Sequence, residues 1–394
     1  MSKIKVKNLY KIFGRNPEKA MTLLEKHSKE EILAKTGQTV GVNNVSFEVK
    51  QGESFVVMGL SGSGKSTLIR CLNRLIEPTS GAIYINNQDI TKLDKKQLGE
   101  IRRGKISMVF QSFAIFPHRT VLENTAYGLK IMGVPQEERL KKAAETLKLV
   151  GLHEWGNHYP SQLSGGMQQR VGLARALATD PEILLMDEAF SALDPLIRKE
   201  MQSELIQIQE KMQRTIIFIT HDLDEALKIG DRIALMKDGE IIQIGTPEEI
   251  LMSPKTEYVR KFVEDVDRTR ILTAEMIMQK NTPVITYPKD GPRIALRNMK
   301  TNALSSIFVV DKQNNFLGIV KAEDALEAVD KGEKTLDNIL NKESPTAGLE
   351  TPLNDMFALL TGKNEPLAIL DDDGKFQGVV VRGNVMAKLA EGVL

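Results

Sequence analysis

A glycine-rich stretch, residues 59–67, has the residue types and spacing of a loop that binds phosphates. It fits the pattern G-x-x-x-x-G-K-[ST], whose glycines let backbone N–H groups turn inward around an anion. The apolar run before it predicts a buried strand and the residues after it predict a helix, which argues against a glycine-rich turn with a chance lysine. The sequence therefore predicts a nucleoside triphosphate site in which Lys65 reaches the β- and γ-phosphates and Ser66 binds Mg²⁺. Its predicted nucleotide contacts are Gly59, Leu60, Ser61, Gly62, Ser63, Gly64, Lys65, Ser66 and Thr67.

Polar side chains follow three further apolar runs that are typical of buried strands. Asp187 and Glu188 end one run, Gln111 follows another, and His221 follows a third. Asp187 can hold Mg²⁺ through water, and Glu188 is placed to orient and deprotonate an attacking water. Gln111 and His221 would reach the γ-phosphate, although each alone could be an ordinary polar residue at a strand end. The predicted metal ligands are therefore Ser66, Gln111 and Asp187, and the predicted catalytic residues are Lys65, Gln111, Glu188 and His221.

A second glycine-rich stretch, residues 163–168, opens another predicted helix. It supplies a serine hydroxyl and glycine N–H groups at a helix N-terminus, where the helix dipole favours negative charge. The sequence therefore predicts a second anion site here, with contacts from Ser164, Gly165, Gly166 and Gln168.

The composition indicates two or three domains with ordinary cores and no overall charge bias. The chain has 394 residues, 41% of them hydrophobic, and 53 Lys and Arg against 52 Asp and Glu. This balance gives no indication of a nucleic-acid partner. The single cysteine, Cys71, excludes an internal disulfide and a multi-cysteine metal site. The N-terminus lacks a signal-peptide pattern and no apolar run is long enough to span a membrane, so we expect a cytoplasmic protein.

Strands that alternate with helices predict an α/β fold, with a parallel sheet covered on both faces. The residues described above then gather at the carboxyl ends of the strands, where open α/β sheets place their ligands. Residues 3–9 alternate polar and apolar, which predicts an edge strand. Residues 16–36 predict one or two amphipathic surface helices inserted into the opening sheet. Residues 121–152 predict helices that are interrupted at residues 133–135.

In their order along the chain, these motifs resemble the nucleotide-binding subunit of ATP-binding-cassette (ABC) transporters. The glycine-rich stretch at 163–168 is the discriminating piece, because other classes of P-loop protein lack it. The resemblance extends over roughly residues 3–265. The inserted segment and residues 111–118 and 186–198 further resemble the ATPases of glycine betaine/proline betaine importers.

The resemblance implies a dimer in which two copies sandwich two ATP molecules head to tail. Ser164, Gly165 and Gly166 would complete the P-loop of the opposite subunit, and Asp194 would lie in the loop that crosses between the two sites. ATP binding would close the dimer and hydrolysis would reopen it.

The resemblance also implies contacts with adenine and with a membrane subunit. Phe13 matches the aromatic residue that stacks on adenine, although Tyr10 is a second candidate and a core aromatic is the alternative. A loop-like segment with Phe113, Phe116 and Pro117 would dock a transmembrane permease subunit, or else form a local hydrophobic cluster.

An internal repeat occupies the tail of the chain. Residues 307–311 and 316–320 recur as residues 367–371 and 376–380, in units of strand, polar turn, strand and helix. The pair resembles tandem CBS domains, which associate face to face and often bind adenine nucleotides. We therefore expect an ABC domain at 1–265 with a helical subdomain at about 112–165, and CBS units at about 277–333 and 338–392 within a tail at 266–394.

The ligand pattern of CBS domains is incomplete in this tail. Lys321 and Val381 replace the threonine of the two units, and Asn384 replaces the ribose-binding aspartate of the second. Binding of AMP or ATP is therefore in doubt, and the resemblance also raises cyclic di-AMP as an inhibitory ligand. A purely structural dimerisation module is the alternative.

Two basic clusters could face anionic lipid and report ionic strength, because such binding weakens with salt. Acidic neighbours dilute both, and a solvated face is the more ordinary explanation. The clusters are Lys92, Lys95, Lys96, Arg102, Arg103 and Lys105, and Arg139, Lys141 and Lys142.

We therefore expect the ATPase subunit of an importer for glycine betaine or another quaternary amine. It would act as a homodimer on two permease subunits at the cytoplasmic side of the membrane, with a binding protein that is separate or fused to the permease. The alternatives are an importer ATPase for another small solute, a soluble ABC protein of translation or DNA repair, and a nucleotide-sensing regulator with a vestigial cassette. The single P-loop without a long coiled-coil insertion argues against the soluble class, and the intact motifs argue against the regulator.

Overall fold

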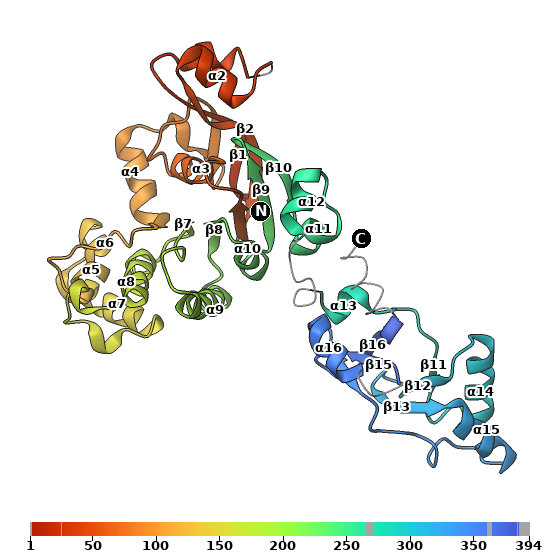
Figure 1. Cartoon of the computed structure of the whole chain (residues 1–394). Helices are drawn as coiled ribbons and strands as arrows, with labels where there is room; N and C mark the ends of the chain where they lie inside the picture. The colour runs from red at the N-terminus through yellow and green to blue at the C-terminus, as the bar shows by residue number, and fades with distance from the viewer. Residues whose placement is uncertain (1, 25, 265–271, 361–364, 384, 386–394) are drawn as a thin grey trace. The chain divides into compact units, whose positions relative to one another are not determined.

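The computed structural model describes residues 2–24, 26–264, 272–360, 365–383 and 385. The chain divides into two compact units, Met1–Val263 and Glu264–Leu394. Figure 1 shows the first unit in red to green and the second in blue-green to blue. The predicted boundary near residue 265 lies outside the described residues.

A six-stranded sheet forms the centre of the first unit, in the order β10-β9-β3-β8-β7-β6. Its pairs are parallel except that of β10 with β9. Every residue of β3, β7 and β8 is buried, since helices cover both faces of a parallel sheet. This confirms the predicted α/β fold. The strands are β3 (Ser54–Met58), β6 (Ile106–Val109), β7 (Ile183–Asp187), β8 (Thr215–Thr220), β9 (Arg232–Lys237) and β10 (Glu240–Gly245).

An antiparallel sheet packs on this core in the order β2-β1-β4-β5. Its strands are β1 (Ser2–Phe13), β2 (Thr39–Lys50), β4 (Ser80–Ile85) and β5 (Gln88–Asp89). The prediction of an edge strand at residues 3–9 is wrong, because β1 pairs with β2 on one side and with β4 on the other. Alternation of polar and apolar residues reports one buried face and carries no information about pairing. Phe47 of β2 stacks on Phe55 of β3 with ring centroids 5.0 Å apart, which joins the two sheets in one core.

The inserted segment between β1 and β2 forms two helices, as predicted: α1 (Pro17–Met21) and α2 (Lys29–Thr36). A capping box of Ser28 and Glu31 begins α2, and Gly37, at φ 69°, ends it. The helices that flank the central sheet are α3 (Lys65–Leu72), α4 (Lys95–Gly104), α8 (Gly165–Leu177), α9 (Pro195–Met212), α10 (Leu223–Ile229), α11 (Pro247–Met252) and α12 (Glu257–Val263).

A helical group lies beside the sheet in Figure 1 and contains α5 (Val121–Thr125), α6 (Tyr127–Ile131) and α7 (Gln136–Leu149), which pack on α8. Gly133, at φ 81°, and Pro135 separate α6 from α7 and confirm the predicted interruption. Cys71, on α3, is fully buried, as its position predicted. The described residues of this unit also form short 3₁₀ turns: η1 (Ile90–Lys92), η2 (His153–Trp155) and η3 (Pro160–Gln162).

The second unit contains two three-stranded sheets of the same topology. The sheets β11-β12-β13 and β14-β15-β16 each have a parallel pair followed by an antiparallel pair. Phe308 and Phe376 join the repeats through rings 5.3 Å apart. The end of the predicted second CBS unit, beyond residue 385, lies outside the described residues. The elements are α13 (Ala274–Ile277), β11 (Val284–Thr286), α14 (Pro292–Thr301), β12 (Ser306–Val310), β13 (Phe316–Lys321), α15 (Ala322–Asp330), β14 (Thr346–Gly348), α16 (Leu353–Leu360), β15 (Leu367–Leu370) and β16 (Phe376–Val380).

Among the residues that the structure describes, no helix combines the length and apolar character needed to cross a bilayer.

Candidate nucleotide-binding and hydrolysis site

The loop between β3 and α3 can be built only with glycines at its two ends. Gly59 has φ 156°, and a Cβ atom there would lie 2.1 Å from the backbone oxygen of Met236. Gly64 has φ 103°, and a Cβ atom there would lie 2.1 Å from the backbone oxygen of Gly41. Since α3 begins at Lys65, the loop delivers its N–H groups to a helix N-terminus, where the dipole favours an anion. Within the loop Leu60 and Ser61 are exposed and Ser63 is buried, while Ser66 and Thr67 lie in the first turn of α3.

Lys65 is held inside this loop. Its side chain is 4% exposed, and Nζ donates hydrogen bonds to the backbone oxygens of Gly59 at 2.8 Å and Leu60 at 3.0 Å. Burial lowers the pKa of Lys65, and the nearby carboxylates of Glu188 and Asp187 oppose that shift. A buried ammonium group at this point can exchange its carbonyl partners for phosphate oxygens.

Asp187, at the end of β7, faces the start of α3. Its carboxylate is 2% exposed and accepts hydrogen bonds from Ser66 Oγ at 2.8 Å and from Arg70 Nη2 at 3.0 Å. A hydroxyl and a carboxylate in contact are the hard oxygen groups that Mg²⁺ takes, usually one or two from protein with phosphate and water completing the shell. The predicted pair of Ser66 and Asp187 therefore fits the metal. Arg70 was not among the site residues predicted from the sequence. Its position four residues after Ser66 nevertheless places both side chains on one face of α3.

Glu188 is the point on which the predicted catalytic side chains converge. Its carboxylate oxygens lie 3.8 Å from Lys65 Nζ, 3.6 Å from His221 Nδ1 and 3.4 Å from Gln111 Nε2. Its backbone φ is 46°, which is unusual for a side chain of this size, and its N–H donates to the backbone oxygen of Ile219 at 3.1 Å. Strained backbone of this kind concentrates at functional positions. The sequence predicted these four residues, but it missed Ser191, whose Oγ accepts from Gln111 Nε2 at 3.2 Å.

Phe13 lies at the end of β1, on the side of the P-loop that carries Thr67. Its side chain is 39% exposed, and Lys11 Nζ lies 4.9 Å from the ring centroid. A Cβ atom at Gly41 would come within 2.8 Å of Phe13 Cε2 and 3.1 Å of Thr67 Cγ2, so these three residues adjoin. The exposed ring is thus available to stack on a base. Tyr10 pairs with Ser80 of β4 three residues earlier on the strand.

We expect Phe13→Ala to weaken ATP binding about 10-fold, because base stacking on an aromatic ring contributes about 1–3 kcal/mol. Tyr10→Ala is the matched variant on the same strand, and we expect little change in its ATP affinity. Titration of a fluorescent ATP analogue measures both dissociation constants. The assignment of Phe13 is wrong if Tyr10→Ala is the variant that loses affinity.

The second glycine-rich stretch begins α8 within the helical group. Ser164 caps the helix by accepting a hydrogen bond from the Met167 N–H at 3.3 Å, and it and Gly165 are exposed. A Cβ atom at Gly166 would lie 2.5 Å from Cγ2 of Ile197, which places this stretch beside the start of α9. Gln168 Nε2 donates hydrogen bonds to the backbone oxygens of Pro160 and Leu163, in the turn before α8. Asp194 is the N-cap of α9 and accepts a hydrogen bond from the Ile197 N–H.

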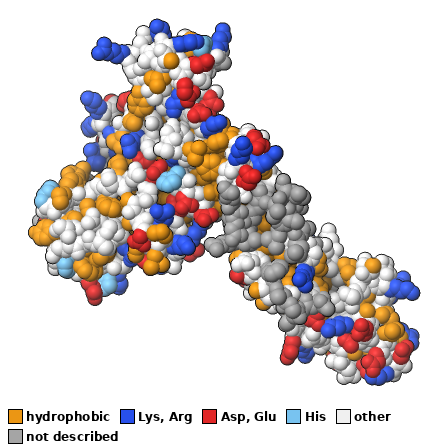
Figure 2. All heavy atoms as spheres, viewed as in Figure 1, with side chains coloured by type: hydrophobic (Ala, Val, Ile, Leu, Met, Phe, Trp, Pro, Cys, Tyr) orange, Lys and Arg blue, Asp and Glu red, His pale blue; other side chains and the backbone are white. Residues whose placement is uncertain are grey.

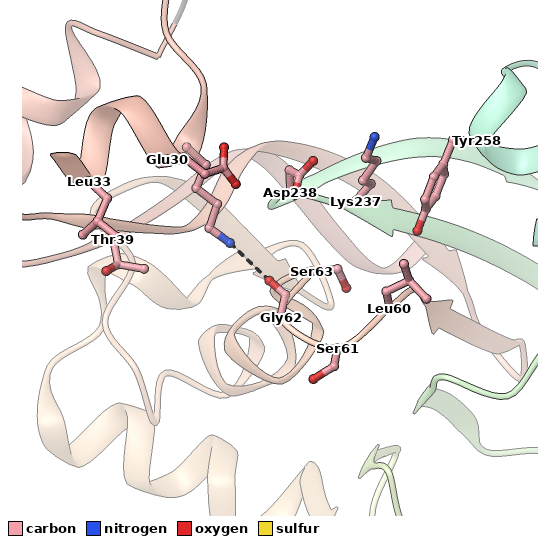
Figure 3. A pocket seen from close by; sticks show the side chains of 11 residues that line it. Glu30, Leu33, Thr39, Leu60, Ser61, Gly62, Ser63, Lys237, Asp238 and Tyr258 are labelled. Atoms are coloured by element: carbon pink, nitrogen blue, oxygen red, sulfur yellow. Dashed lines mark hydrogen bonds between the residues drawn. The ribbon is translucent and has the colours of Figure 1, made fainter. Parts of the chain in front are cut away.

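A cavity of about 350 Å³ lies beside the P-loop, and part of its wall comes from the inserted helix α2 (Figure 3). Lys29 Nζ, at the start of α2, donates a hydrogen bond to the Gly62 backbone oxygen at 3.1 Å. The insertion therefore contacts the P-loop directly, and nothing in the spacing of its sequence indicated this contact. The lining residues are Lys29, Glu30, Leu33, Thr39, Leu60, Ser61, Gly62, Ser63, Lys237, Asp238 and Tyr258.

The side chains in the segment predicted to dock a permease are only partly exposed to solvent. Phe113 and Phe116 are half-buried and Pro117 is exposed. Phe116 packs on Tyr127 with ring centroids 4.5 Å apart, and the Arg119 guanidinium lies 4.9 Å from the Phe116 ring centroid. Phe116 thus belongs to a local cluster, while Pro117 remains on the surface.

In the first basic cluster, the guanidinium of Arg102 binds backbone atoms of its own chain. Arg102 donates hydrogen bonds to the backbone oxygens of Asn73 at 2.8 Å and Arg74 at 2.6 Å, so it supports the turn after α3. Lys95, Lys96 and Arg103 are exposed. Figure 2 shows Lys and Arg side chains interspersed with acidic ones on the face in view.

In the second unit, a cavity of about 310 Å³ lies between the two repeats. Lys321, which replaces the threonine of the CBS pattern, forms an ion pair with Glu365 at 2.8 Å. The lining residues are Gln279, Thr282, Pro283, Ala303, Leu304, Ser305, Ser306, Ile307, Phe308, Leu360, Glu365, Pro366, Val379, Val381 and Arg382.

Comparison with known proteins identifies both parts of the chain. Family models match at residues 42–191, described as ABC transporter, and at residues 274–331, described as CBS domain. The chain is 59% identical to the glycine betaine transport ATP-binding protein OpuAA of Bacillus subtilis, over 98% of this chain and 92% of that protein. It is 54% identical to the glycine betaine/carnitine transport ATP-binding protein GbuA of Listeria monocytogenes, over 99% of this chain and 98% of that protein.

Among solved structures, the chain is similar to a dimeric structure of the ATP-binding cassette MJ0796 in a post-hydrolysis state bound to ADP and Pi. The TM-score is 0.53 and the identity 36%, over 62% of this chain and 98% of that one. These similarities confirm the predicted ABC and CBS architecture. The chain therefore belongs to the family of ATP-hydrolysing ABC transporter subunits that includes the glycine betaine transport ATP-binding proteins.

Proposed function

We propose that the chain hydrolyses ATP in a head-to-tail dimer and thereby drives import of glycine betaine or a related quaternary amine. The observation that carries the catalytic part is the convergence of Lys65, Gln111 and His221 on the carboxylate of Glu188. The cargo class rests on the two relatives described above, both of which are named for glycine betaine and one also for carnitine.

We assign the following roles to the groups of the site. The loop N–H groups and Lys65 bind the phosphates, and Phe13 stacks on adenine. Glu188 accepts a proton from the attacking water, and Gln111 and His221 hold that water and the γ-phosphate in line. Ser66 and Asp187 would hold Mg²⁺ together with Gln111, and the metal would supply positive charge against the phosphates.

The second anion site completes the arrangement in the dimer. Ser164 and Gly165 are exposed at the start of α8, and together with Gly166 they would meet the γ-phosphate bound by another copy. A dimeric, ADP-bound cassette is the state in which a similar protein was solved. Gln168 would fix the turn before α8 through its bonds to backbone oxygens.

The remaining partners follow from this function. A transmembrane permease would bind the segment around Pro117, which would hold the chain at the cytoplasmic side of the membrane. An external binding protein, separate or fused to the permease, would deliver the cargo. The second unit would regulate turnover by binding cyclic di-AMP or an adenine nucleotide in the cavity between its repeats. The basic clusters of the first unit would face anionic lipid.

The test is ATPase activity of the complex with its permease and binding protein, reconstituted in vesicles of anionic lipid. Glycine betaine is titrated on the binding-protein side, and salt and cyclic di-AMP on the ATPase side. We expect betaine to stimulate hydrolysis and the dinucleotide to inhibit it. Stimulation by an unrelated solute instead would refute the cargo class, and loss of the dinucleotide effect alone would refute the regulatory ligand.

A further inference from the structure

A buried chain of polar side chains joins the helix that follows Asp194 to the end of the strand that precedes His221. Gln202 Nε2, on α9, donates a hydrogen bond to Glu225 Oε1, on α10, at 3.0 Å. The other carboxylate oxygen of Glu225 accepts a hydrogen bond from Thr220 Oγ1, at the end of β8. The three residues are 6%, 4% and 2% exposed, in the order Gln202, Glu225 and Thr220. A buried carboxylate is costly unless its hydrogen bonds are made, so this network has little freedom to rearrange.

A second, outer link runs parallel to the buried one. Arg198 Nη1, on the first turn of α9, lies 3.6 Å from Asp222 Oδ2. Its Nη2 donates to the backbone oxygens of Ser191 at 3.4 Å and Leu193 at 3.1 Å, so one guanidinium holds the loop before α9. The Asp222 N–H in turn donates to Thr220 Oγ1 at 2.9 Å. Both links therefore end on the residues that flank His221.

Helix α9 connects the loop that ends at Asp194 with the turn that contains His221. Asp194 is its N-cap, with Oδ1 accepting from the Ile197 N–H at 3.1 Å, and the helix continues to Met212. A displacement of Asp194 must carry the first two turns of α9 with it, because an α-helix does not compress along its axis. Gln202 lies two turns into the helix and would pass the displacement to Glu225 and so to Thr220.

We propose that Gln202, Glu225 and Thr220 are positioning residues that couple the two ATP sites of the dimer. This inference rests on the head-to-tail dimer proposed above, in which Asp194 lies beside the ATP of the opposite subunit. Occupancy of one site then shifts Asp194, and α9 transmits the shift to His221 of the other site. Coupling of this kind makes hydrolysis depend cooperatively on ATP, with a Hill coefficient that can approach the number of sites.

The test measures the hydrolysis rate of the full-length chain against ATP concentration. Gln202→Met keeps the length and volume of the side chain but cuts the link to α9, while the bond between Thr220 and Glu225 remains. We expect the Hill coefficient to fall from near the limit of roughly two to about one and the maximal rate to fall about 5-fold, with ATP affinity unchanged. Gln209→Met is the matched control, since Gln209 lies on the same helix and its hydrogen bonds go to backbone atoms. Its Nε2 donates to the backbone oxygens of Gly52 and Arg214, and its Oε1 accepts from the Arg214 N–H.

A second pair of variants separates positioning from stability. Thr220→Val removes the hydroxyl at constant volume, and Thr220→Ser keeps it. We expect Thr220→Val to lower the maximal rate about 10-fold and Thr220→Ser to restore most of it, at equal ATP affinity. Equal rates for the valine and serine variants would contradict the positioning of His221.

The proposed function and this inference fail in different ways. If the chain does not dimerise with ATP when Glu188 is replaced by Gln, the dimer itself is wrong. If it dimerises but the Hill coefficient of Gln202→Met equals that of Gln209→Met, the coupling through α9 is wrong. A non-cooperative wild type would overturn the coupling as well.

Discussion

Replacement of Glu188 by glutamine is expected to lower the rate of ATP hydrolysis about 1,000-fold and to leave ATP binding intact. General-base catalysis contributes between 10² and 10⁴ in rate, and glutamine cannot accept the proton of the attacking water. Glutamine has the same size as glutamate, so its amide would occupy the place of the carboxylate beside Gln111 and His221. Lys65 retains its place in the loop through the carbonyls of Gly59 and Leu60.

The same variant should accumulate as an ATP-bound dimer, because closure needs ATP and reopening needs its hydrolysis. Size-exclusion chromatography with and without ATP measures this state beside a phosphate-release assay. Glu145→Gln, on the exposed face of α7, is the control and should match the wild type in both assays. Hydrolysis at the wild-type rate by the Glu188→Gln dimer would overturn the assignment of Glu188 as the base.

Strand-end residues were predictable because their positions follow from local pattern. Asp187, Glu188 and His221 each come at or directly after the end of a fully buried strand, and parallel strands bring their carboxyl ends to one edge. The glycine turn before α3 was predictable for the same reason, since its spacing and its flanks are local. The α/β fold and the repeat in the tail needed only alternation and self-similarity.

Contacts between segments distant in the sequence were not predictable in this way. Lys29 reaches Gly62 only because the insertion folds back over the P-loop, and Gln202 meets Glu225 only after α9 and α10 pack together. The position of β1 in the middle of its sheet also depends on pairing partners. A single sequence carries periodicity and motifs, but it does not carry the register in which distant elements meet.

Gly64→Ala should weaken ATP binding by more than roughly 100-fold, the second large effect that the P-loop geometry predicts. Gly64 has φ 103° and ψ 1°, and a Cβ atom there would lie 2.1 Å from the Gly41 backbone oxygen. Gly41 is part of β2, between neighbours paired with β1, so its backbone cannot withdraw without disturbing the strand. The loop itself must shift instead, and the N–H groups that cradle the phosphates shift with it.

Gly62→Ala is the matched control for this prediction. Gly62 also has a positive φ, 80°, but a Cβ atom there would meet no heavy atom within 4 Å. Only backbone strain of about 1 kcal/mol is expected, which corresponds to roughly 5-fold weaker binding. Titration with a fluorescent ATP analogue measures both affinities, and thermal unfolding with and without ATP checks the fold, because a variant that cannot bind loses the stabilisation that ligand provides. If both alanine variants lose affinity equally, the cause is positive φ alone and the close approach of Gly64 to β2 does not shape the site.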